Sequence, residues 1–240
     1  MSDTIIRVKN VKKDYELGMT VIPALKGVSF EIAEGEFLSI VGPSGCGKST
    51  LLNIIGCIDK ATSGQVTFQN VDLETLNDDQ EAEIRLSKVG FIFQSFNLIP
   101  VMTCLENVTL PMSFAGMQAD AAWDKGLEIL KMVGLGHRAL HKPGELSGGQ
   151  QQRVAIARSL ANSPEIILAD EPTANLDQRT GEEIIEVFAE LKATLGVTII
   201  TATHDLKMLK RSDRIMWIAD GRIDRIAKPS EIDFSNQEFH

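Results

Sequence analysis

A glycine-rich stretch that leads into a lysine and two hydroxyl residues has the clearest chemistry in the sequence. Residues 42–50 fit the pattern G-x-x-x-x-G-K-[ST] of a phosphate-binding loop. Such a loop points several backbone N–H groups at one spot, and the helix that follows it adds partial positive charge. Lys48 can reach the β- and γ-phosphates of a nucleoside triphosphate, and the Ser49 hydroxyl can bind Mg²⁺. An ordinary glycine-rich turn does not require the whole pattern. We therefore predict a triphosphate site formed by Gly42, Pro43, Ser44, Gly45, Cys46, Gly47, Lys48, Ser49 and Thr50.

An apolar run that ends in two acids predicts a second part of the site. Residues 166–169 are Ile-Ile-Leu-Ala, and Asp170, Glu171 and Pro172 follow them. A strand that ends in Asp places this carboxylate in the crevice where α/β sheets bind ligands, so we expect Asp170 to bind Mg²⁺, directly or through water. Glu171 is a candidate to orient or deprotonate an attacking water. The alternative, two solvated acids in a loop, is disfavoured by the apolar run before the pair.

Three further positions have two interpretations each. His204 follows the β-branched run 197–203. A lone His is usually structural, but at the end of a core strand it could hydrogen-bond a γ-phosphate. Residues 147–150, Ser-Gly-Gly-Gln, precede a helical pattern and form either a plain N-cap or a second anion site. Tyr15, the single tyrosine, could stack on a nucleotide base or pack on a strand from a turn.

Alternation of apolar and polar residues predicts the strands that flank this site. The pattern occurs at residues 5–8 and 27–32, and shorter strand-like runs occur at 65–68 and 89–93. We expect these four segments to form an antiparallel layer beside the nucleotide, with Tyr15 in the connection between the first two strands.

The middle of the chain has a helical pattern instead. From about residue 97 to 138 strand signals fade, and Thr103-Cys-Leu-Glu106 resembles a capping box. Trp123, Leu127 and Leu130 predict a helix with one apolar face, which Gly134 ends. These residues predict a helical insertion that has one face on the core and an exposed face free to bind a partner.

Helix and hairpin signals return in the last third of the sequence. A capping box at residues 180–183 predicts a helix that Gly196 ends. Residues 214–219 and 222–226 predict a hairpin, because Asp220-Gly221 between them suits a tight turn. Residues 234–240 are expected to form a loose polar tail.

Composition limits the classes of function. The chain has 240 residues, no apolar run long enough to span a bilayer, and no basic-then-apolar N-terminal leader. A net charge of −9 disfavours non-specific binding to nucleic acid or anionic lipid, so a membrane role would need a protein partner. Cys46, Cys57 and Cys104 fit a reducing cytosol better than a disulfide framework. Because Cys46 lies at a helix N-terminus, it is either a reactive thiol whose alkylation would obstruct phosphate binding or an inert small residue.

Taken together, these motifs resemble the ATP-binding cassette (ABC) ATPase family. They occur in the family's order: Tyr15, the phosphate loop, Gln94, Leu146-Ser-Gly-Gly-Gln150, Asp170-Glu171, Ala174-Asn-Leu-Asp177 and His204. The resemblance covers about residues 5–226. Residues 53–56, 90–100 and 105–108 further resemble the subgroup that serves lipoprotein release, macrolide export and FtsX-like permeases. The additional C-terminal domain of some importers' ATPases is not expected, since the sequence stops soon after the hairpin.

The resemblance implies a head-to-tail homodimer with two ATP molecules and Mg²⁺ between its subunits. In this arrangement Ser147 and Gly149, within the LSGGQ segment Leu146–Gln150, bind the γ-phosphate held by the other copy. Asp177 links the two sites. Gln94 contacts Mg²⁺ and water and senses a membrane partner through the helical insertion. The resemblance thus implies that Ser147, Gly148, Gly149 and Gln150 of the LSGGQ segment bind ATP.

We thus expect an α/β fold with a P-loop NTPase (RecA-like) core, an antiparallel β layer and a helical insertion. One ABC ATPase domain would occupy residues 1–240. Residues 1–95 and 163–226 would form the nucleotide-binding core with the β layer, 96–162 the helical subdomain, and 227–240 the tail.

The expected function is hydrolysis of ATP to power a membrane permease, with Glu171, His204, Lys48 and Gln94 as catalytic residues. The chain would lie in the cytoplasm on the inner face of the membrane, held there by the permease. Two alternatives remain open: an ATPase that acts on DNA or the ribosome, and an ATP-gated scaffold or mechanotransmission ATPase coupled to an FtsX-like protein. The acidic charge and the lack of a long coiled-coil pattern disfavour a nucleic-acid partner.

Overall fold

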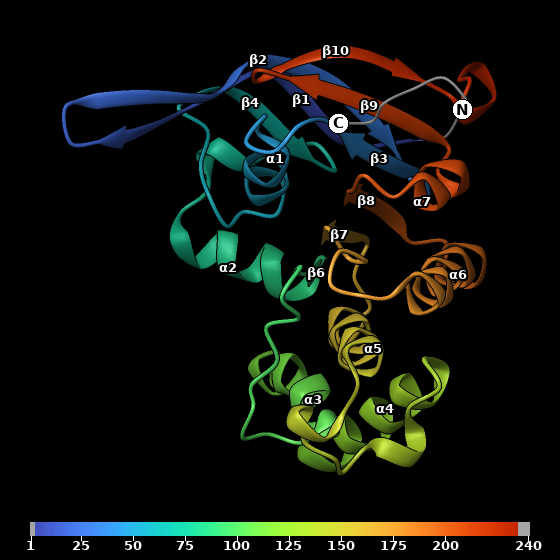
Figure 1. Ribbon diagram of the computed structural model, residues 1–240. Helices are drawn as coiled ribbons and strands as arrows, with labels where there is room; N and C mark the ends of the chain where they lie inside the picture. The colour runs from blue at the N-terminus through green and yellow to red at the C-terminus, as the bar shows by residue number, and fades with distance from the viewer. Residues whose placement is uncertain (1–2, 235–240) are drawn as a thin grey trace.

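Two β-sheets pack face to face in the computed structural model, which describes residues 3–234 (Figure 1). The first sheet is antiparallel, with strand order β2-β1-β4-β5. Its strands are β1 (Thr4–Leu17), β2 (Thr20–Ala33), β4 (Ser63–Phe68) and β5 (Val71–Asp72). The second sheet has the order β10-β9-β3-β8-β7-β6 and is parallel except for β10. Its strands are β3 (Phe37–Val41), β6 (Val89–Ile92), β7 (Ile166–Asp170), β8 (Thr198–Ala202), β9 (Arg214–Ala219) and β10 (Arg222–Ala227).

One helix packs between the two sheets, and most of the others pack on the far side of the parallel sheet. The helices are α1 (Lys48–Ile55), α2 (Asp78–Ser87), α3 (Cys104–Phe114), α4 (Ala119–Met132), α5 (Gly148–Ser159), α6 (Gln178–Leu195) and α7 (Leu206–Arg211). Short 3₁₀ turns occur at Leu73–Thr75, Gly136–Arg138, Pro143–Glu145 and Pro229–Glu231. Within residues 3–234, no helix has both the length and the apolar character needed to cross a bilayer.

The parallel sheet divides the core into two clusters. Alternate residues of a strand point to opposite faces, so Leu38 and Ile40 of β3 pack with α1 and the antiparallel sheet. Phe37 packs on the other face with the cluster that α3, α4, α5 and α6 contribute. All five residues of β3 are buried, as in a strand covered on both faces. The expected combination of an α/β core, an antiparallel layer and a helical segment is confirmed by this arrangement.

Two strand predictions need correction. Residues 89–93 do not join the antiparallel layer, because β6 pairs in parallel with β7 at the edge of the core sheet. The apolar run Val-Gly-Phe-Ile-Phe indicates a strand but does not specify its partner, because the pairing with β7 joins segments far apart in the sequence. Tyr15 does not lie in a connection either: it lies within β1, opposite Ile22 of β2. The β1–β2 hairpin extends well beyond the body of the molecule (Figure 1).

The helices that the sequence predicts are present, but the prediction is incomplete and some details differ. The capping box of α3 is present, since Thr103 and Glu106 bond each other's backbone N–H groups. In α4 the predicted apolar face is displaced, because Gly126 is buried against α3 and Trp123 is half exposed. A Cβ on Gly126 would lie 2.6 Å from Thr109 Cγ2, so any larger residue would require the facing side chains of α3 to move. Helix α2 was not predicted, although Asn77 and Gln80 form its capping box.

Two further corrections concern the last third of the chain. Helix α6 begins at Gln178, and its N-cap is Asp177 rather than the predicted Thr180. The Asp177 carboxylate accepts hydrogen bonds from Thr180 N at 3.1 Å and Thr180 Oγ1 at 2.6 Å. The predicted loose tail is wrong for Phe234, which packs against the cluster of Val41, Leu209 and Ile215. The remaining tail residues, 235–240, lie outside the described residues. The predicted hairpin of β9 and β10 is confirmed.

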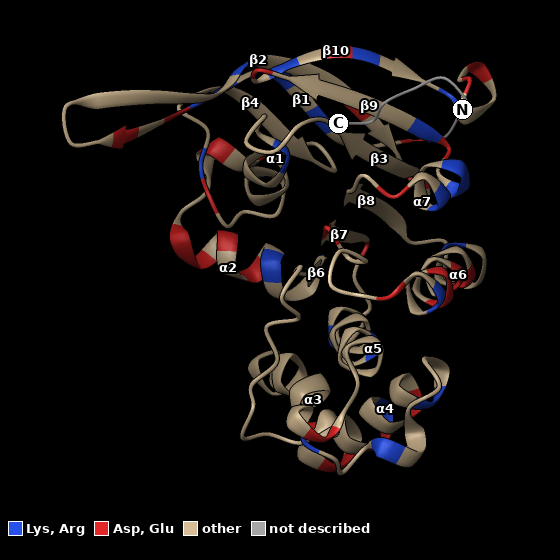
Figure 2. Ribbon diagram, viewed as in Figure 1, with Lys and Arg blue, Asp and Glu red and all other residues tan. Residues whose placement is uncertain are grey.

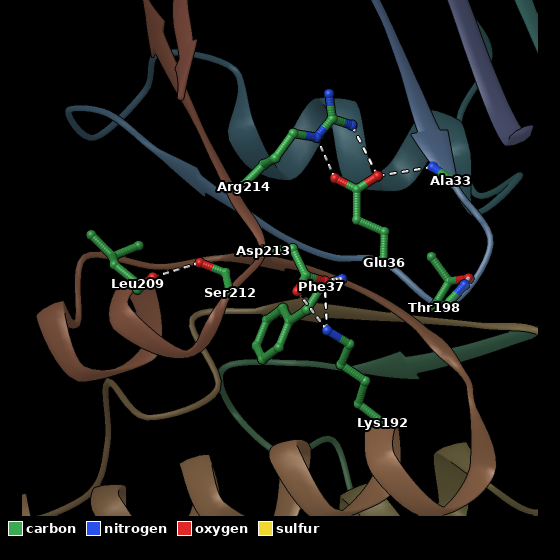
Figure 3. Close-up of polar contacts among 10 residues, drawn as sticks. Ala33, Glu36, Phe37, Lys192, Thr198, Leu209, Ser212, Asp213 and Arg214 are labelled. Carbon is green, nitrogen blue, oxygen red and sulfur yellow. Dashed lines mark hydrogen bonds and ion pairs between the residues drawn. The ribbon is translucent and has the colours of Figure 1, made fainter. Parts of the chain in front are cut away.

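A polar cluster fixes the beginning of β3 at the edge of the sheet opposite the predicted site (Figure 3). Glu36, 8% exposed, pairs with both Nε and Nη2 of Arg214 and accepts a hydrogen bond from Ala33 N at 2.8 Å. Beside it, Asp213 accepts Phe37 N at 2.8 Å and pairs with Lys192 of α6. The cluster therefore ties the start of β3 to β9 and to α6.

We expect Glu36→Ala to destabilise the protein by about 2 kcal/mol, because Arg214 and the Ala33 N–H would lose a buried acceptor. Urea unfolding followed by circular dichroism measures the change. The matched control is Glu31→Ala, which removes the exposed pair with Arg7 on the antiparallel sheet and should cost less than about 1 kcal/mol. Equal losses from the two variants would contradict the structural role of the buried Glu36 carboxylate.

Candidate functional site

Parallel pairing brings the predicted site residues to one edge of the core sheet. Ala202 of β8 lies between Ile40 of β3 and Asp170 of β7 in the register of the sheet. The phosphate loop follows β3, His204 follows β8, and Glu171 follows β7 at this same edge (Figure 1). Gln94 follows β6, the next strand along. Segments far apart in the sequence thus meet where parallel strands end, which is the usual ligand crevice of such sheets.

The phosphate loop has the backbone conformation that its glycines allow. Gly42, Gly45 and Gly47 all have positive φ, and Gly47 is the N-cap of α1. A Cβ on Gly42 would lie 2.0 Å from the Ile218 carbonyl oxygen of β9, whereas a Cβ on Gly45 would meet nothing within 4 Å. The first glycine is therefore required by packing against β9, and the middle one only by its backbone angle.

The loop also holds its lysine close to itself. The Lys48 ammonium donates hydrogen bonds to the carbonyls of Gly42 at 2.7 Å and Pro43 at 3.2 Å. Ser44 and Gly45, at the tip of the loop, are exposed, as are Pro43 and Ser49. Cys46 is only 5% exposed and belongs to the cluster between the sheets, so its burial favours the interpretation of an inert packing residue.

Glu171 and His204 form a pair at the centre of the shared edge. Glu171 Oε2 lies 3.0 Å from His204 Nδ1, and the Glu171 side chain is 17% exposed against 67% for the histidine. Glu171 has φ 47, a left-handed conformation that costs a non-glycine residue about 1 kcal/mol or more. Its N–H donates to Ala202 O at 2.8 Å, which holds the residue in this conformation beside β8. The carboxylate is thus directed at the histidine by the backbone.

The residue types at this edge suit a magnesium ion held partly by phosphate. The Ser49 hydroxyl, the Gln94 amide and the Asp170 carboxylate provide the oxygen ligands that Mg²⁺ prefers. No group of three or more His, Cys, Asp or Glu side chains that could hold a metal occurs within residues 3–234. The three predicted oxygen donors are therefore too few for a site made only of protein, and suffice where a triphosphate supplies further oxygens.

The LSGGQ segment lies away from the phosphate loop of its own chain. Ser147 is the N-cap of α5, with Gln150 N donating to Ser147 Oγ at 3.4 Å and Ser147 N donating to Gln150 Oε1 at 3.0 Å. A Cβ on Gly149 would lie 2.1 Å from Thr180 Cγ2, so this helix start packs directly on the start of α6. In Figure 1 α5 and α1 lie well apart. Ser147 therefore caps α5, and a phosphate bound at this helix start would be one that the phosphate loop of the same chain does not hold.

The structure adds contacts that sequence patterns do not indicate. The Asn175 side chain donates to Gln94 O at 2.9 Å, and Arg158 of α5 donates to Phe96 O at 2.8 Å. Burial lowers the pKa of Arg158 below its usual value. Gln152 of α5, wholly buried, donates to the Pro172 carbonyl at 2.7 Å. These side chains connect the Gln94 loop and the Glu171 loop to neighbouring loops and to α5.

Tyr15 lies beside the first turn of α1. Its hydroxyl donates to Asp59 Oδ2 at 2.8 Å and lies 3.5 Å from Thr50 Oγ1. The residue is 39% exposed, which leaves room for a ligand against the ring. Its place next to α1 favours the stacking interpretation over the turn tyrosine. Asp59 was not predicted as part of the site, because its contact with Tyr15 spans 44 positions.

Comparison with known proteins identifies close relatives. A family model described as ABC transporter matches residues 25–174. An uncharacterized ABC transporter ATP-binding protein, MJ0796 of Methanocaldococcus jannaschii, is 51% identical, covering 93% of this chain and 97% of its own length. The lipoprotein-releasing system ATP-binding protein LolD of Geobacter metallireducens is 45% identical, over 92% of this chain and 98% of its own. The macrolide export ATP-binding/permease protein MacB of Syntrophobacter fumaroxidans is also 45% identical over 92% of this chain, which spans 31% of MacB.

Solved structures agree with the sequence relatives. A dimeric structure of MJ0796 in a post-hydrolysis state, bound to ADP and Pi, has a TM-score of 0.87 at 50% identity and covers 93% of this chain and 98% of its own. A second dimeric structure of the same protein also has a TM-score of 0.87.

We expect Gly42→Ala to destabilise the ligand-free protein by several kcal/mol, on the order of 3, because the new Cβ would overlap the Ile218 carbonyl. Gly45→Ala is the matched control: it has the same new methyl group and a positive φ but open space, so it should cost about 1 kcal/mol. Thermal unfolding without nucleotide measures both. If the control were the more damaging variant, packing on β9 would not explain the first glycine.

Proposed function

This chain belongs to the ABC transporter family, and on that premise we propose that it is the ATP-binding and ATP-hydrolysing subunit of a membrane transport complex. The observation that carries the proposal is the Glu171–His204 pair, 3.0 Å apart, at the edge of the sheet that also bears the phosphate loop. A carboxylate oriented by a histidine beside a triphosphate site is suited to activating water for attack on a γ-phosphate. The MJ0796 structure with ADP and Pi supports the same reaction.

Within one site, the residues of this chain position the nucleotide, the metal ion and the attacking water. Lys48 and the loop N–H groups hold the phosphates, and Thr50 and Tyr15 lie on the side of the base. Ser49, Gln94 and Asp170 would hold Mg²⁺, which supplies charge neutralisation at the phosphates when bound. Glu171 orients and deprotonates the water, and His204, held by its Nδ1 contact with Glu171, directs its other ring nitrogen to the γ-phosphate.

A complete site needs a second copy of the chain. We assign Ser147, Gly148, Gly149 and Gln150 to the γ-phosphate held by the other subunit, because the start of α5 lies apart from the phosphate loop of its own chain (Figure 1). Asp177, the N-cap of α6, adjoins the helix start that bears Gly149 and is suited to linking the two sites. The dimeric MJ0796 structures support a two-fold arrangement.

The partner in the membrane is the finer part of the proposal. We assign the chain to an FtsX- or MacB-like permease of the lipoprotein, amphiphile or drug export type, at the inner face of the membrane. The similarity to LolD and to the ATP-binding part of MacB supports this. The helical segment of about residues 96–162 would bind the permease, and residues 1–95 and 163–226 would bind nucleotide. Stimulation of ATP hydrolysis by a co-purified permease tests it; coupling to an FtsX-like protein without transport would indicate mechanotransmission instead.

We expect Glu171→Gln to reduce ATP hydrolysis about 10²–10³-fold while leaving ATP binding intact, because the amide can still hydrogen-bond but cannot accept the proton of water. ATP would then hold the two copies together. Phosphate release and size-exclusion chromatography with Mg-ATP measure the two effects. A variant that stays monomeric at high concentration with Mg-ATP would contradict the shared site.

Two inactive variants should restore each other's activity when mixed. Lys48→Ala removes the phosphate-loop lysine, and Ser147→Arg blocks the helix start that faces the partner. Each homodimer therefore contains no complete site. A mixed dimer contains one site with both Lys48 and Ser147 intact. Phosphate release by the mixture, compared with each variant alone, is the measurement. No gain on mixing, with mixed dimers demonstrated by cross-linking, would show that Ser147 does not act on the other copy's nucleotide.

A further inference from the structure

Two side chains, those of Lys13 and Asp59, contact Tyr15 at the base of the projecting hairpin. The Lys13 ammonium donates to Asp59 Oδ1 at 2.5 Å and to the Lys60 carbonyl at 2.8 Å. The other Asp59 oxygen, Oδ2, accepts the Tyr15 hydroxyl at 2.8 Å. Asp59 thus uses one oxygen for the lysine and the other for the tyrosine. These contacts are well shielded for a surface group, since the Lys13 side chain is 13% exposed and that of Asp59 27%.

Lys13 also determines which face of the Tyr15 ring is open. Its ammonium lies 4.9 Å from the ring centroid, a favourable cation–π distance. One face of the ring is therefore covered by a cation that Asp59 holds in place. A planar ligand that stacks on this ring would therefore use the face opposite Lys13, and the residue is 39% exposed.

Asp59 is in turn attached to the helix that carries the phosphate loop. Its backbone N–H donates to Asn53 O at 3.2 Å, and the N–H of Ile58 donates to the same carbonyl at 2.8 Å. Asn53 lies in α1, the helix whose first residue is Lys48. A short series of contacts thus connects the lysine that faces the phosphates to the ring that faces the base.

The charge state of the group agrees with this geometry. Burial opposes ionisation of Asp59, but hydrogen bonds from Lys13 and Tyr15 outweigh it and leave the pKa of this carboxyl below its usual value. Burial also raises the pKa of the Tyr15 hydroxyl, which therefore remains a donor at neutral pH.

We propose that Asp59 is a positioning residue that sets the Tyr15 ring at a fixed place relative to the phosphate loop, so that only one ring face receives the base of the nucleotide. This inference rests on the proposed function, because it assumes that the ligand is a nucleoside triphosphate. Asp59 itself touches neither base nor phosphate. Its effect is on the recognition of the base, and the recognition of the triphosphate does not depend on it.

The test separates the base from the phosphates. ATP and inorganic tripolyphosphate are titrated into the full chain with Mg²⁺, for wild type, Asp59→Ala, Asp59→Asn, Tyr15→Phe and the double variant Asp59→Ala/Tyr15→Phe. We expect Asp59→Ala and Tyr15→Phe each to weaken ATP binding about fivefold, the value of one hydrogen bond. Asp59→Asn keeps an acceptor for the tyrosine and should recover part of the loss. Tripolyphosphate binding should be unchanged in all variants.

The double variant decides whether the two residues act together. If Asp59 acts through Tyr15, the double variant binds ATP no worse than the single ones; additive losses would overturn the proposal. So would an Asp59→Ala variant with wild-type ATP affinity, or one that loses ATP and tripolyphosphate equally. Glu31→Ala, which breaks the exposed Arg7 pair of the same sheet, is the matched control and should bind both ligands normally. A wild-type chain that binds no ATP would instead overturn the proposed function.

Discussion

Parallel pairing of β3 with β8, and of β8 with β7, is the constraint on which the site depends. In a parallel pair the register fixes which residues of the two strands lie side by side. If one strand shifted by one residue, its side chains would turn to the opposite face of the sheet. The register places Ile40 and Asp170 on either side of Ala202. Three loops therefore start level with one another, and this placement allows the long-range contact between Glu171 and His204.

The opposite edge of the sheet holds this register in place. Glu36 and Asp213 bind the backbone at the start of β3 and pair with Arg214 and Lys192 from elsewhere in the chain (Figure 3). Acidic residues lie along α2 and α6, and several basic residues lie on α7 (Figure 2). At the start of β3, Glu36 is buried and the Asp213–Lys192 pair is partly exposed. Loss of these contacts would displace the strand that leads into the phosphate loop.

Local patterns predicted the parts of the site that lie within one segment. The phosphate loop, the strand before Asp170 and the N-cap at Ser147 each depend on neighbouring residues, so the sequence was sufficient for them. The placement of β6 and the contact of Tyr15 with Asp59 depend on segments far apart, and no local pattern encodes them. The N-cap of α6 was misplaced for a different reason: Asp177 and Thr180 are both good capping residues, and only the geometry of the turn decides between them.

The three buried cysteines allow local unfolding of the chain to be followed by thiol modification. Cys46 lies in the phosphate loop, Cys57 beyond the end of α1, and Cys104 at the first turn of α3, and all three are free and buried. Burial, with Glu81 nearby, raises the pKa of Cys57 to about 11, and burial also raises that of Cys104, so neither thiol forms an appreciable thiolate while the protein is closed. Because all three sulfurs are buried, thiol modification would proceed through fluctuations that uncover each one. Its rate at the three positions would record how easily the loop, the region between the sheets and the helical segment each come apart.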